Sequence, residues 1–392
     1  MKSKIFKYIE ESYQEMIKIR RHLHMYPELS FQEKETAQFI ADYQRELGLD
    51  VRTEVGGNGV VATLKGKKPG KTVAIRADFD ALPIQEENDV PYKSTVDGVM
   101  HACGHDAHTA IALGLSKSFS QIKDQLSGTI VFIHQHAEEQ DPGGAQAMIA
   151  DGALEGVDVI FATHMENYLE VDQIWHSYDY ILGASDDFKI TIEGVGGHGA
   201  FPQDTTDVIQ IGSQLVNQLH QIVSRKVDPL KSAVLTVGSF HAGHTTNVIS
   251  NQAILEGTVR SFDDDVRIQM SEWVKQVADY TVKGLGADVT VQYDFGYPAT
   301  KNDARVNERL VQAAKDVLPE ANIHEMKPNM GAEDFAYFTR KIPGVYFFTG
   351  SANKNKGLIY PYHHPKFDID EKALLNGAKV IGSAVIDYLN ES

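Results

Sequence analysis

Residues 128–139 read Gly-Thr-Ile-Val-Phe-Ile-His-Gln-His-Ala-Glu-Glu, and this stretch decides the class of fold that we expect. Residues 129–133 are all β-branched or aromatic, which predicts a strand buried on both faces, as in the parallel sheet of an α/β protein. The strand ends near His136, so Glu138 and Glu139 follow its carboxyl end. Active sites of α/β folds collect at the carboxyl ends of strands, which makes this carboxylate pair the first candidate site.

Strands and helices alternate on both sides of this stretch. Apolar residues at helical spacing predict helices, and short β-branched runs predict strands. The alternation favours an α/β fold with a mixed, largely parallel sheet flanked by helices. The expected helices of this part are 3–24, 33–47, 107–119, 144–151, 306–317 and 372–389, and the expected strands are 60–64, 72–76, 128–136, 157–164 and 344–348.

The pattern changes between about residues 184 and 298. Phe188, Ile190 and Ile192 alternate with polar residues, which predicts a half-exposed strand. The elements expected here follow the order β, α, β, β, α, β, that of a split βαβ sandwich. We therefore predict one domain of residues 1–183 and 299–392, interrupted by an inserted α+β sandwich domain of residues 184–298. The six elements of the insertion are 187–193, 208–223, 233–240, 252–260, 266–282 and 288–293.

Composition excludes several classes of protein. The chain has 392 residues, of which 42% are hydrophobic and 23% charged, and this length favours two folded domains. It has 37 Lys and Arg against 54 Asp and Glu, a formal net charge of −17, and such a surface repels the phosphates of a nucleic acid. The single cysteine, Cys103, cannot form an internal disulfide, which argues against a disulfide-stapled secreted domain. There are 16 His.

The start of the chain carries no targeting signal that we recognise. Residues 1–16 are charged throughout and lack the apolar stretch of a secretory signal. No run of about 18 apolar residues occurs, so we expect no membrane span. These features predict a cytoplasmic enzyme or binding protein.

Possible metal ligands occur in four segments, three of which follow expected strands. Each segment has an ordinary structural explanation by itself: a lone cysteine is most often a small buried hydrophobe, and we expect His101 and His108 to solvate the loop or cap a helix. Together, however, thiolate, imidazole and carboxylate groups are the ligands of zinc and similar ions. The segments are 100–108 with Cys103 and His105, 137–139 with the two Glu, 163–164 with His164, and 362–365 with His363.

The Glu pair indicates catalysis as well as binding. One of two neighbouring carboxylates can hold an ion while the other acts as a base towards a water whose pKa the ion has lowered. Two ions a few ångströms apart need a bridging ligand, and a thiolate such as Cys103 can bridge. Asp80, after another expected strand, is in a position to fix the tautomer of a ligand imidazole.

Seven motifs carry a resemblance that runs from about residue 20 to the end of the chain. The chain resembles the bacterial N-acyl-amino-acid amidohydrolases, a family of two-metal metallopeptidase-type enzymes that also contains hippurate hydrolase and the auxin-conjugate hydrolases. The motifs occur in family order: Arg76-Ala-Asp-Phe-Asp-Ala-Leu-Pro83, Met100-His-Ala-Cys-Gly-His-Asp106, Ala137-Glu-Glu139, Gly196-Gly-His-Gly-Ala200, Thr246-Asn-Val-Ile249, Gly257-Thr-Val-Arg260 and Gly331-Ala-Glu-Asp-Phe335.

The resemblance implies a zinc-peptidase-like catalytic domain with two divalent ions per chain, zinc or manganese in the first place and cobalt or nickel as alternatives. It also implies that residues 184–298 form a lid that dimerises, so we expect a homodimer or a homotetramer. Glu138 becomes the general base, and the lid residues His198, Asn247 and Arg260 become substrate contacts. The metal ligands carried over by motif are Cys103, the expected bridge, with His105, Glu139, His164 and His363.

Two departures from the family pattern lie beside expected ligands. The family usually has Gln-Pro before Ala-Glu-Glu, where this chain has Gln135-His136, and often Gly-Leu-His where it has Ala162-Thr163-His164. Both departures leave the ligands in place and bear on substrate preference. We expect His136 to support the site from behind.

The sequence thus predicts a metal-dependent hydrolase that cleaves the amide bond of N-acyl amino acids or short peptides. A dipeptidase, an aminopeptidase or a peptidase acting on longer peptides would use the same ligands. A metal-binding protein without catalysis is the alternative from another class, and the carboxylate of Glu138 beside the expected ligands speaks against it. The preferred acyl group, the preferred amino acid and the metal stay open.

Overall fold

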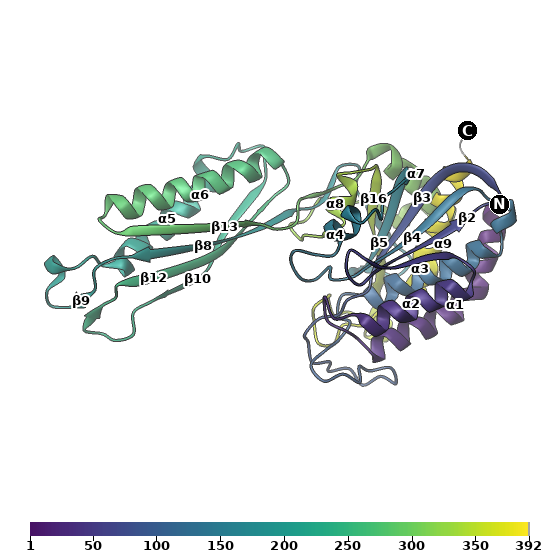
Figure 1. Ribbon diagram of the computed structural model, residues 1–392, viewed down its shortest axis with the longest axis horizontal. Helices are drawn as coiled ribbons and strands as arrows, with labels where there is room; N and C mark the ends of the chain where they lie inside the picture. The colour runs from purple at the N-terminus through teal and green to yellow at the C-terminus, as the bar shows by residue number, and fades with distance from the viewer. Residues whose placement is uncertain (391–392) are drawn as a thin grey trace. The chain divides into compact units, whose positions relative to one another are not determined.

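The computed structural model describes residues 1–390, which form two compact units (Figure 1). Within the described residues, the first unit comprises residues 1–181, 301–327 and 334–390, and the second comprises residues 182–300 and 328–333. The segment that we predicted as an insertion, 184–298, lies within the second unit. Residues 328–333, which the sequence pattern had left with the first domain, group with the second unit.

The first unit is built on a mixed eight-stranded sheet of order β1-β2-β4-β3-β5-β16-β6-β15. Neighbouring strands in its centre run parallel: β3 pairs with β4 and β5, and β5 with β16. This confirms the α/β fold with a largely parallel sheet. The strands are β1 (Asp50–Val55), β2 (Gly59–Lys65), β3 (Lys68–Asp78), β4 (Ser127–Gln135), β5 (Val159–Glu170), β6 (Ile174–His176), β15 (Ile323–Glu325) and β16 (Gly344–Ala352), with β7 (Tyr180–Leu182) and β14 (Thr300–Lys301) as a separate short pair.

Apolar helix faces form the core of this unit against the sheet. In α1, Ile5, Ile9 and Leu23 are buried at helical spacing, as the sequence pattern predicted, and Met16 is buried with them. Helices α3 and α9 pack on the sheet and α1 packs on both of them, so the central strands are covered and rich in apolar residues. The helices are α1 (Lys2–Met25), α2 (Lys34–Glu46), α3 (His105–Ser120), α4 (Ala145–Ala150), α7 (Ala304–Lys315), α8 (Ala336–Thr339) and α9 (Lys372–Asn390).

A buried ion-pair network joins α1 to the first turn of α3. The Arg20 guanidinium is fully buried, and its Nε lies 2.9 Å from Asp106 Oδ2 while its Nη2 lies 2.8 Å from Asp368 Oδ1. His24 Nδ1 lies 2.8 Å from the same Asp106 oxygen. Burial by itself would raise the pKa of Asp106, but the charge of Arg20 and the hydrogen bond from His24 hold it well below its usual range. The network therefore fixes the end of α3 that begins at His105.

Arg20→Leu is expected to lower the free energy of unfolding by about 3–5 kcal/mol, because it leaves the buried carboxylate of Asp106 without its cation. Arg21→Leu is the matched control: Arg21 is the next residue, its side chain is 44% exposed and it pairs with Glu371. An exposed pair contributes at most about 1 kcal/mol. Urea denaturation of both metal-free variants measures the difference, and equal midpoints would contradict the assignment of the network as a structural support.

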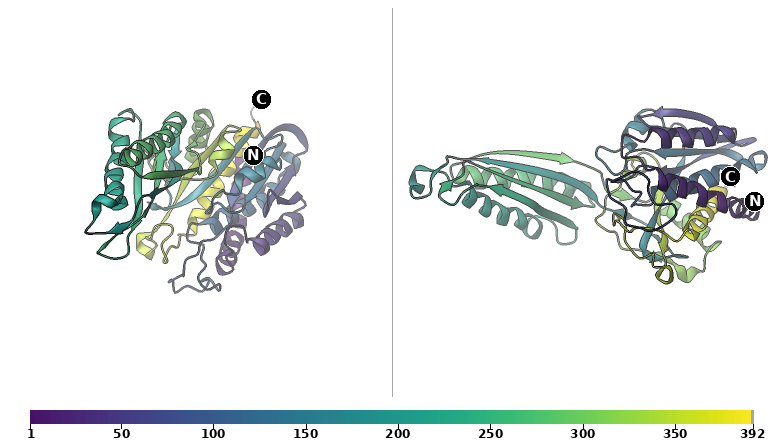
Figure 2. Two further views of the ribbon diagram at one scale, coloured as in Figure 1. Left: turned by 60° about the vertical axis from the view of Figure 1, so that its left-hand side comes forward. Right: turned by 90° about the horizontal axis from the view of Figure 1, so that it is seen from below.

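The second unit is a four-stranded antiparallel sheet of order β10-β12-β8-β13 with two helices on one face (Figure 2). Phe188, Ile190 and Ile192 of β8 point into this core, and polar residues alternate with them. Both helices begin at an Asp whose side chain accepts backbone N–H groups, Asp207 and Asp263. The elements are β8 (Ala184–Glu193), α5 (Val208–Arg225), β10 (Ala233–Ala242), β12 (Gln252–Ser261), α6 (Asp264–Gly284) and β13 (Asp288–Phe295), with a short pair β9 (Gly197–His198) and β11 (Val248–Ile249).

The six main elements of this unit follow the β, α, β, β, α, β order that the sequence predicted. The pair β9–β11 is an addition, too short for periodicity to reveal. Across residues 1–390, no helix is long and apolar enough to cross a membrane.

Candidate metal centre

The possible ligands of the first unit lie in loops and strand ends at the carboxyl edge of the sheet. Cys103 lies in the loop before α3 and His105 is the first residue of that helix. Glu138 and Glu139 follow β4, and His164 lies in β5. The sequence-predicted ligands of this unit are thus brought together from segments far apart in the chain, with His363 added from the loop that precedes α9.

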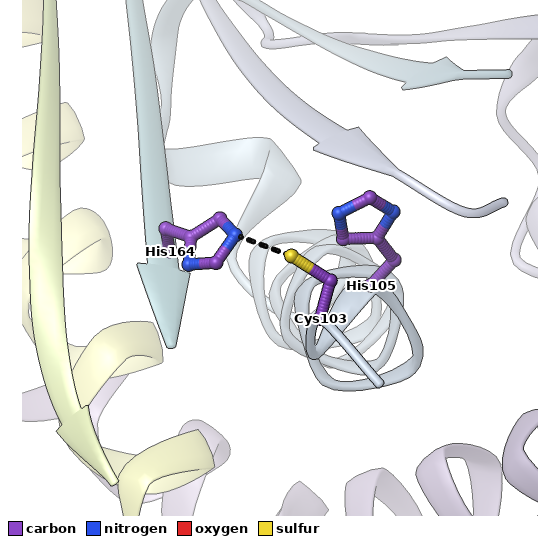
Figure 3. Close-up of side chains that lie close together, drawn as sticks. All are labelled: Cys103, His105 and His164. Carbon is purple, nitrogen blue, oxygen red and sulfur yellow. Dashed lines mark hydrogen bonds between the residues drawn. The ribbon is translucent and has the colours of Figure 1, made fainter. Parts of the chain in front are cut away.

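Cys103 is the residue shared by two groups of possible ligands. Its Sγ lies 3.3 Å from Nε2 of His164, and His105 stands beside them at the start of α3 (Figure 3). Cys103, His105 and His164 each offer a ligand atom within 4.8 Å of the others, and so do Cys103, Glu139 and His363. Cys103 is therefore common to the two groups of possible ligands.

The Glu pair closes the centre on the side of His105. Nε2 of His105 lies 3.7 Å from Oε1 of Glu139 and 4.0 Å from Oε2 of Glu138. Glu139 also faces His363, whose Nε2 lies 3.4 Å from Glu139 Oε2. Glu139 is thus close to both His105 and His363. Among these contacts, Glu138 is close to His105 only.

Hydrogen bonds orient two of the imidazoles towards the centre. Nδ1 of His105 lies 3.0 Å from Oδ1 of Asp80 and 3.0 Å from its backbone carbonyl, and Nδ1 of His164 lies 2.8 Å from the carbonyl of Met165. Since each Nδ1 then carries the proton, each Nε2 presents its lone pair to the centre. Asp80 has the orienting position that the sequence predicted for it, and its Oδ2 also accepts the N–H of Glu139 and the hydroxyl of Ser30.

A divalent metal fits this donor set. Nε2 of His105 and Oε1 of Glu139 are both buried and have no hydrogen-bond partner within residues 1–390. A buried polar atom without a partner is costly, so both atoms call for a ligand that can accept a lone pair. Thiolate, imidazole and carboxylate are the ligand types that zinc and related ions take.

Electrostatics also favour a cation at this point. Burial lowers the pKa of His105, but the charge of Asp78 and the hydrogen bond to Asp80 outweigh it and raise that pKa to about 10. Burial, together with the charges of Glu139 and Glu138, raises the pKa of the Cys103 thiol well above its usual range. For His105 the cause is the negative charge of its neighbours, which would also favour a metal cation at this point.

Two residues lie elsewhere than we expected. The prediction that His101 and His108 solvate the loop or cap a helix is wrong, because both are buried. His108 donates from Nδ1 to Oδ1 of Asp78 (2.6 Å) and accepts the N–H of Met165 at Nε2 (2.9 Å). Through these two hydrogen bonds His108 links β3 to β5 behind the possible metal ligands. The spacing of residues along a predicted helix does not indicate such a link.

The loop between α1 and α2 supports the Glu pair, which sequence reasoning missed. Ala137 has a positive φ of 52°, a conformation that residues with a Cβ rarely adopt. Its N–H donates to Oε1 of the buried Glu33 (2.8 Å), and Asn58 donates to Oε2 of the same carboxylate (3.0 Å). His136 is buried beside this turn with its ring edge-to-face on Phe31, which agrees with a supporting role.

The predicted substrate contacts His198, Asn247 and Arg260 belong to the second unit. His198 lies in β9 opposite Val248 of β11, and Gly199 donates its N–H to the carbonyl of Asn247 (2.8 Å), so His198 and Asn247 lie on one short ladder. Arg260 lies in β12, where its guanidinium bonds within its own strand, to Thr258 and Val259. Their roles towards a substrate stay predictions.

A buried centre of thiolate, imidazole and carboxylate donors beside a second carboxylate defines a metal-dependent hydrolase. The chain belongs to the peptidase family M20/M25/M40, whose model matches residues 74–387, and the resemblance seen in the sequence is confirmed.

Individual relatives agree with this assignment over most of the chain. The Bacillus subtilis protein YhaA, whose name describes an amidohydrolase, is 50% identical over 388 residues, which are 99% of this chain and 98% of that protein. An N-acyl-L-amino acid amidohydrolase of Geobacillus stearothermophilus is 46% identical over 296 residues, which are 76% of this chain and 80% of that protein. The solved structure of a dinuclear metal-binding peptidase of the M20 family from Bacillus subtilis has a TM-score of 0.84 and 33% identity, covering 97% of this chain and 99% of that one.

Asp80→Ala is expected to weaken metal binding by about 10–100-fold, because His105 loses the charged one of its two Nδ1 acceptors and Glu139 loses the acceptor for its N–H. Competition with a chromophoric chelator measures the affinity. Asp89→Ala is a suitable control, since Asp89 lies in a neighbouring loop and makes none of these bonds. An affinity within twofold of the unchanged protein would show that Asp80 does not orient the ligands.

Proposed function

We propose that the protein hydrolyses the amide bond of N-acyl amino acids, as a metal-dependent amidohydrolase of its family. The observation that carries the proposal is the pair of donor groups that share Cys103, with Glu138 beside them. A relative that is 46% identical bears the name N-acyl-L-amino acid amidohydrolase, and another that is 50% identical bears that of an amidohydrolase. The chemistry of the site and the names of these relatives agree.

The ligand assignment follows the two donor groups. We assign His105 and His164 to one ion, Glu139 and His363 to the other, and Cys103 to both. The donor set suits zinc or manganese, with cobalt and nickel as alternatives.

Glu138 is the residue that we assign as general base and acid. Bound divalent ions would supply the polarisation of the scissile carbonyl and the lowered pKa of the attacking water. Glu138 takes a proton from that water and returns it to the nitrogen of the leaving amine, which completes hydrolysis without a covalent intermediate on the protein. Asp80 keeps Nδ1 of His105 protonated throughout, and the buried Glu33 holds the turn that carries Glu138 through the N–H of Ala137.

Several properties of the whole protein belong to the same proposal. We assign His198, Asn247 and Arg260 to binding the carboxylate of the substrate or the developing oxyanion. We expect a homodimer formed through the second unit, or a tetramer built from such dimers, and a location in the cytoplasm. Size-exclusion chromatography with light scattering tests the oligomeric state, since a monomer at all concentrations would contradict the expected dimer or tetramer.

The test of the function is a hydrolysis panel on metal-supplemented protein. N-acetyl and N-benzoyl amino acids are offered with added zinc or manganese, and release of the free amino acid is measured. Turnover that a chelator abolishes and added metal restores is the expected result. No turnover of any N-acyl amino acid by protein that binds metal would contradict the proposal.

A peptidase is the second candidate, because the solved M20 relative at 33% identity is described as a peptidase. The same ligands and the same base would cleave a peptide bond. Dipeptides and oligopeptides in the same panel separate the two: a kcat/KM for a peptide above that for every N-acyl amino acid would favour the peptidase.

A further inference from the structure

The strand that carries His164 continues with a second ionisable side chain on the same face. Successive residues of a strand point to opposite faces, so Glu166, two residues after His164 in β5, points to the face of that ligand. The register of β5 with β16 places Phe348 opposite His164 and Gly350 opposite Glu166. Glu166 therefore lies on the face of the sheet that carries His164.

Glu166 is a buried carboxylate with no counter-charge. It is 2% exposed, and its Oε1 accepts the N–H of Tyr168 at 2.8 Å. Within residues 1–390, no Lys, Arg or His forms an ion pair with it, and that single hydrogen bond is the whole of its polar contacts. Burying a carboxylate without a partner costs several kcal/mol in general, and a cation from outside the chain would offset that cost.

Two tyrosines lie near this carboxylate: Tyr168 donates its backbone N–H to it, and its charge acts on the hydroxyl of Tyr362. Tyr168 is 67% exposed, and its ring meets that of Tyr362 with centroids 6.2 Å apart at 88°. The ring of Tyr362 in turn lies edge-to-face on His164, with centroids 5.9 Å apart. Asn167 fixes the loop that carries Tyr362, because its Nδ2 donates to the carbonyl of Tyr360 (2.8 Å). Two aromatic faces at right angles beside a carboxylate are a typical environment for an ammonium group.

We propose that Glu166, Tyr168 and Tyr362 form a subsite for a primary ammonium group of the substrate, next to the scissile amide. The inference rests on the proposed function and narrows its substrate class to molecules that carry a positive charge. The ammonium can come from the side chain of an N-acylated basic amino acid or from the free amino end of a short peptide. Glu166 pairs with it, and the tyrosine rings stabilise it through cation–π contacts.

A competing explanation has Glu166 as a balancing charge for the metal ions, without a substrate contact. The two explanations differ in what Glu166→Gln changes. A balancing charge affects all substrates and the metal content alike, whereas an ammonium subsite affects only substrates that carry the charge. Discrimination between charged and neutral isosteres is therefore the quantity to measure.

The experiment compares two pairs of substrates of matched shape. Nα-acetyl-L-lysine is set against N-acetyl-L-2-aminoheptanoic acid, and L-alanyl-L-alanine against N-isobutyryl-L-alanine, each with a methyl group in place of the ammonium group. The pair that shows the preference identifies the source of the ammonium. The unchanged protein is expected to favour the charged member of one pair by at least tenfold in kcat/KM, and Glu166→Gln to reduce that ratio by at least tenfold. Tyr168→Leu, at an exposed position, is expected to reduce the ratio several-fold. Glu170→Gln on the same strand and Tyr280→Leu on an exposed face of α6 are the controls.

Binding without turnover gives an independent measurement. In calorimetric titrations of zinc-loaded Glu138→Gln protein, the charged member of the preferred pair is expected to bind at least tenfold more tightly than its neutral isostere, and Glu166→Gln added to that protein is expected to abolish the difference. Equal affinities within each pair, or a loss of metal and an equal loss for both members, would overturn the subsite. If the ammonium preference in binding persists while no N-acyl amino acid or peptide is hydrolysed, the proposed function fails and the subsite stands.

Discussion

Glu138→Gln is expected to lower kcat for an N-acyl amino acid by about 10²–10⁴-fold while the metal content stays at its original value. Glutamine keeps the size of the side chain but cannot accept the proton of the attacking water, and general base catalysis contributes a factor of this order. Glu138 is 7% exposed, and its Oε2 lies 4.0 Å from Nε2 of His105. KM is expected to change far less than kcat, because the side chain acts in the chemical step.

Two further variants make this result specific. Glu139→Gln, one residue on, is expected to lose metal together with activity, since Glu139 faces both His105 and His363. Glu155→Gln, at an exposed position, controls for the loss of one negative charge and is expected to leave both unchanged. Turnover by Glu138→Gln within about tenfold of the unchanged protein, at equal metal content, would remove Glu138 from the role of base.

The fold could be predicted from the sequence wherever burial produces a regular pattern of apolar residues. The run 129–133 is covered on both faces in β4, and the alternation in 187–193 reports the one-sided burial of β8. Strands without such a trace were missed: β1 is largely exposed, and the short β6 and β15 pair with each other at the sheet edge. The pattern of apolar residues along the chain therefore indicates strands that contribute to the core. It does not indicate exposed or very short strands, whose position depends on pairing with other strands.

The sequence predicted which possible ligands come together and the contact of Asp80 with His105, but it did not predict the contact of Glu33 with the turn before the Glu pair. Cys103, His105 and the Glu pair occur in short motifs whose residue types already indicate metal chemistry. Glu33 contacts Ala137 across 104 positions of the chain, and nothing in the sequence near Glu33 indicates that contact. A supporting residue such as Glu33, which lies outside the motifs, is thus found only when the fold has brought the segments together.

Cys103→Ala is expected to reduce the metal content from two ions per chain to one at most. Cys103 belongs both to the group with His105 and His164 and to the group with Glu139 and His363, so its loss removes a ligand from each. Two ions held close together also repel, and a thiolate between them offsets that repulsion. Metal analysis after dialysis against a weak chelator measures the stoichiometry, and two ions retained per chain would exclude the bridging role.

The proposed role of Cys103 as a metal ligand can also be tested in the unmodified protein. Because the chain has one thiol, a thiol-specific reagent reports on Cys103 alone. The metal-loaded protein is expected to react at least tenfold more slowly than the metal-free protein, since a thiolate engaged by two ions is a poor nucleophile. Cys103 is 7% exposed, so burial alone already slows the reaction in both forms, and only the ratio between them reports on the metal. Substitution with cobalt adds a second readout, because a sulfur-to-cobalt charge-transfer band requires the thiolate as a ligand and must vanish in Cys103→Ala.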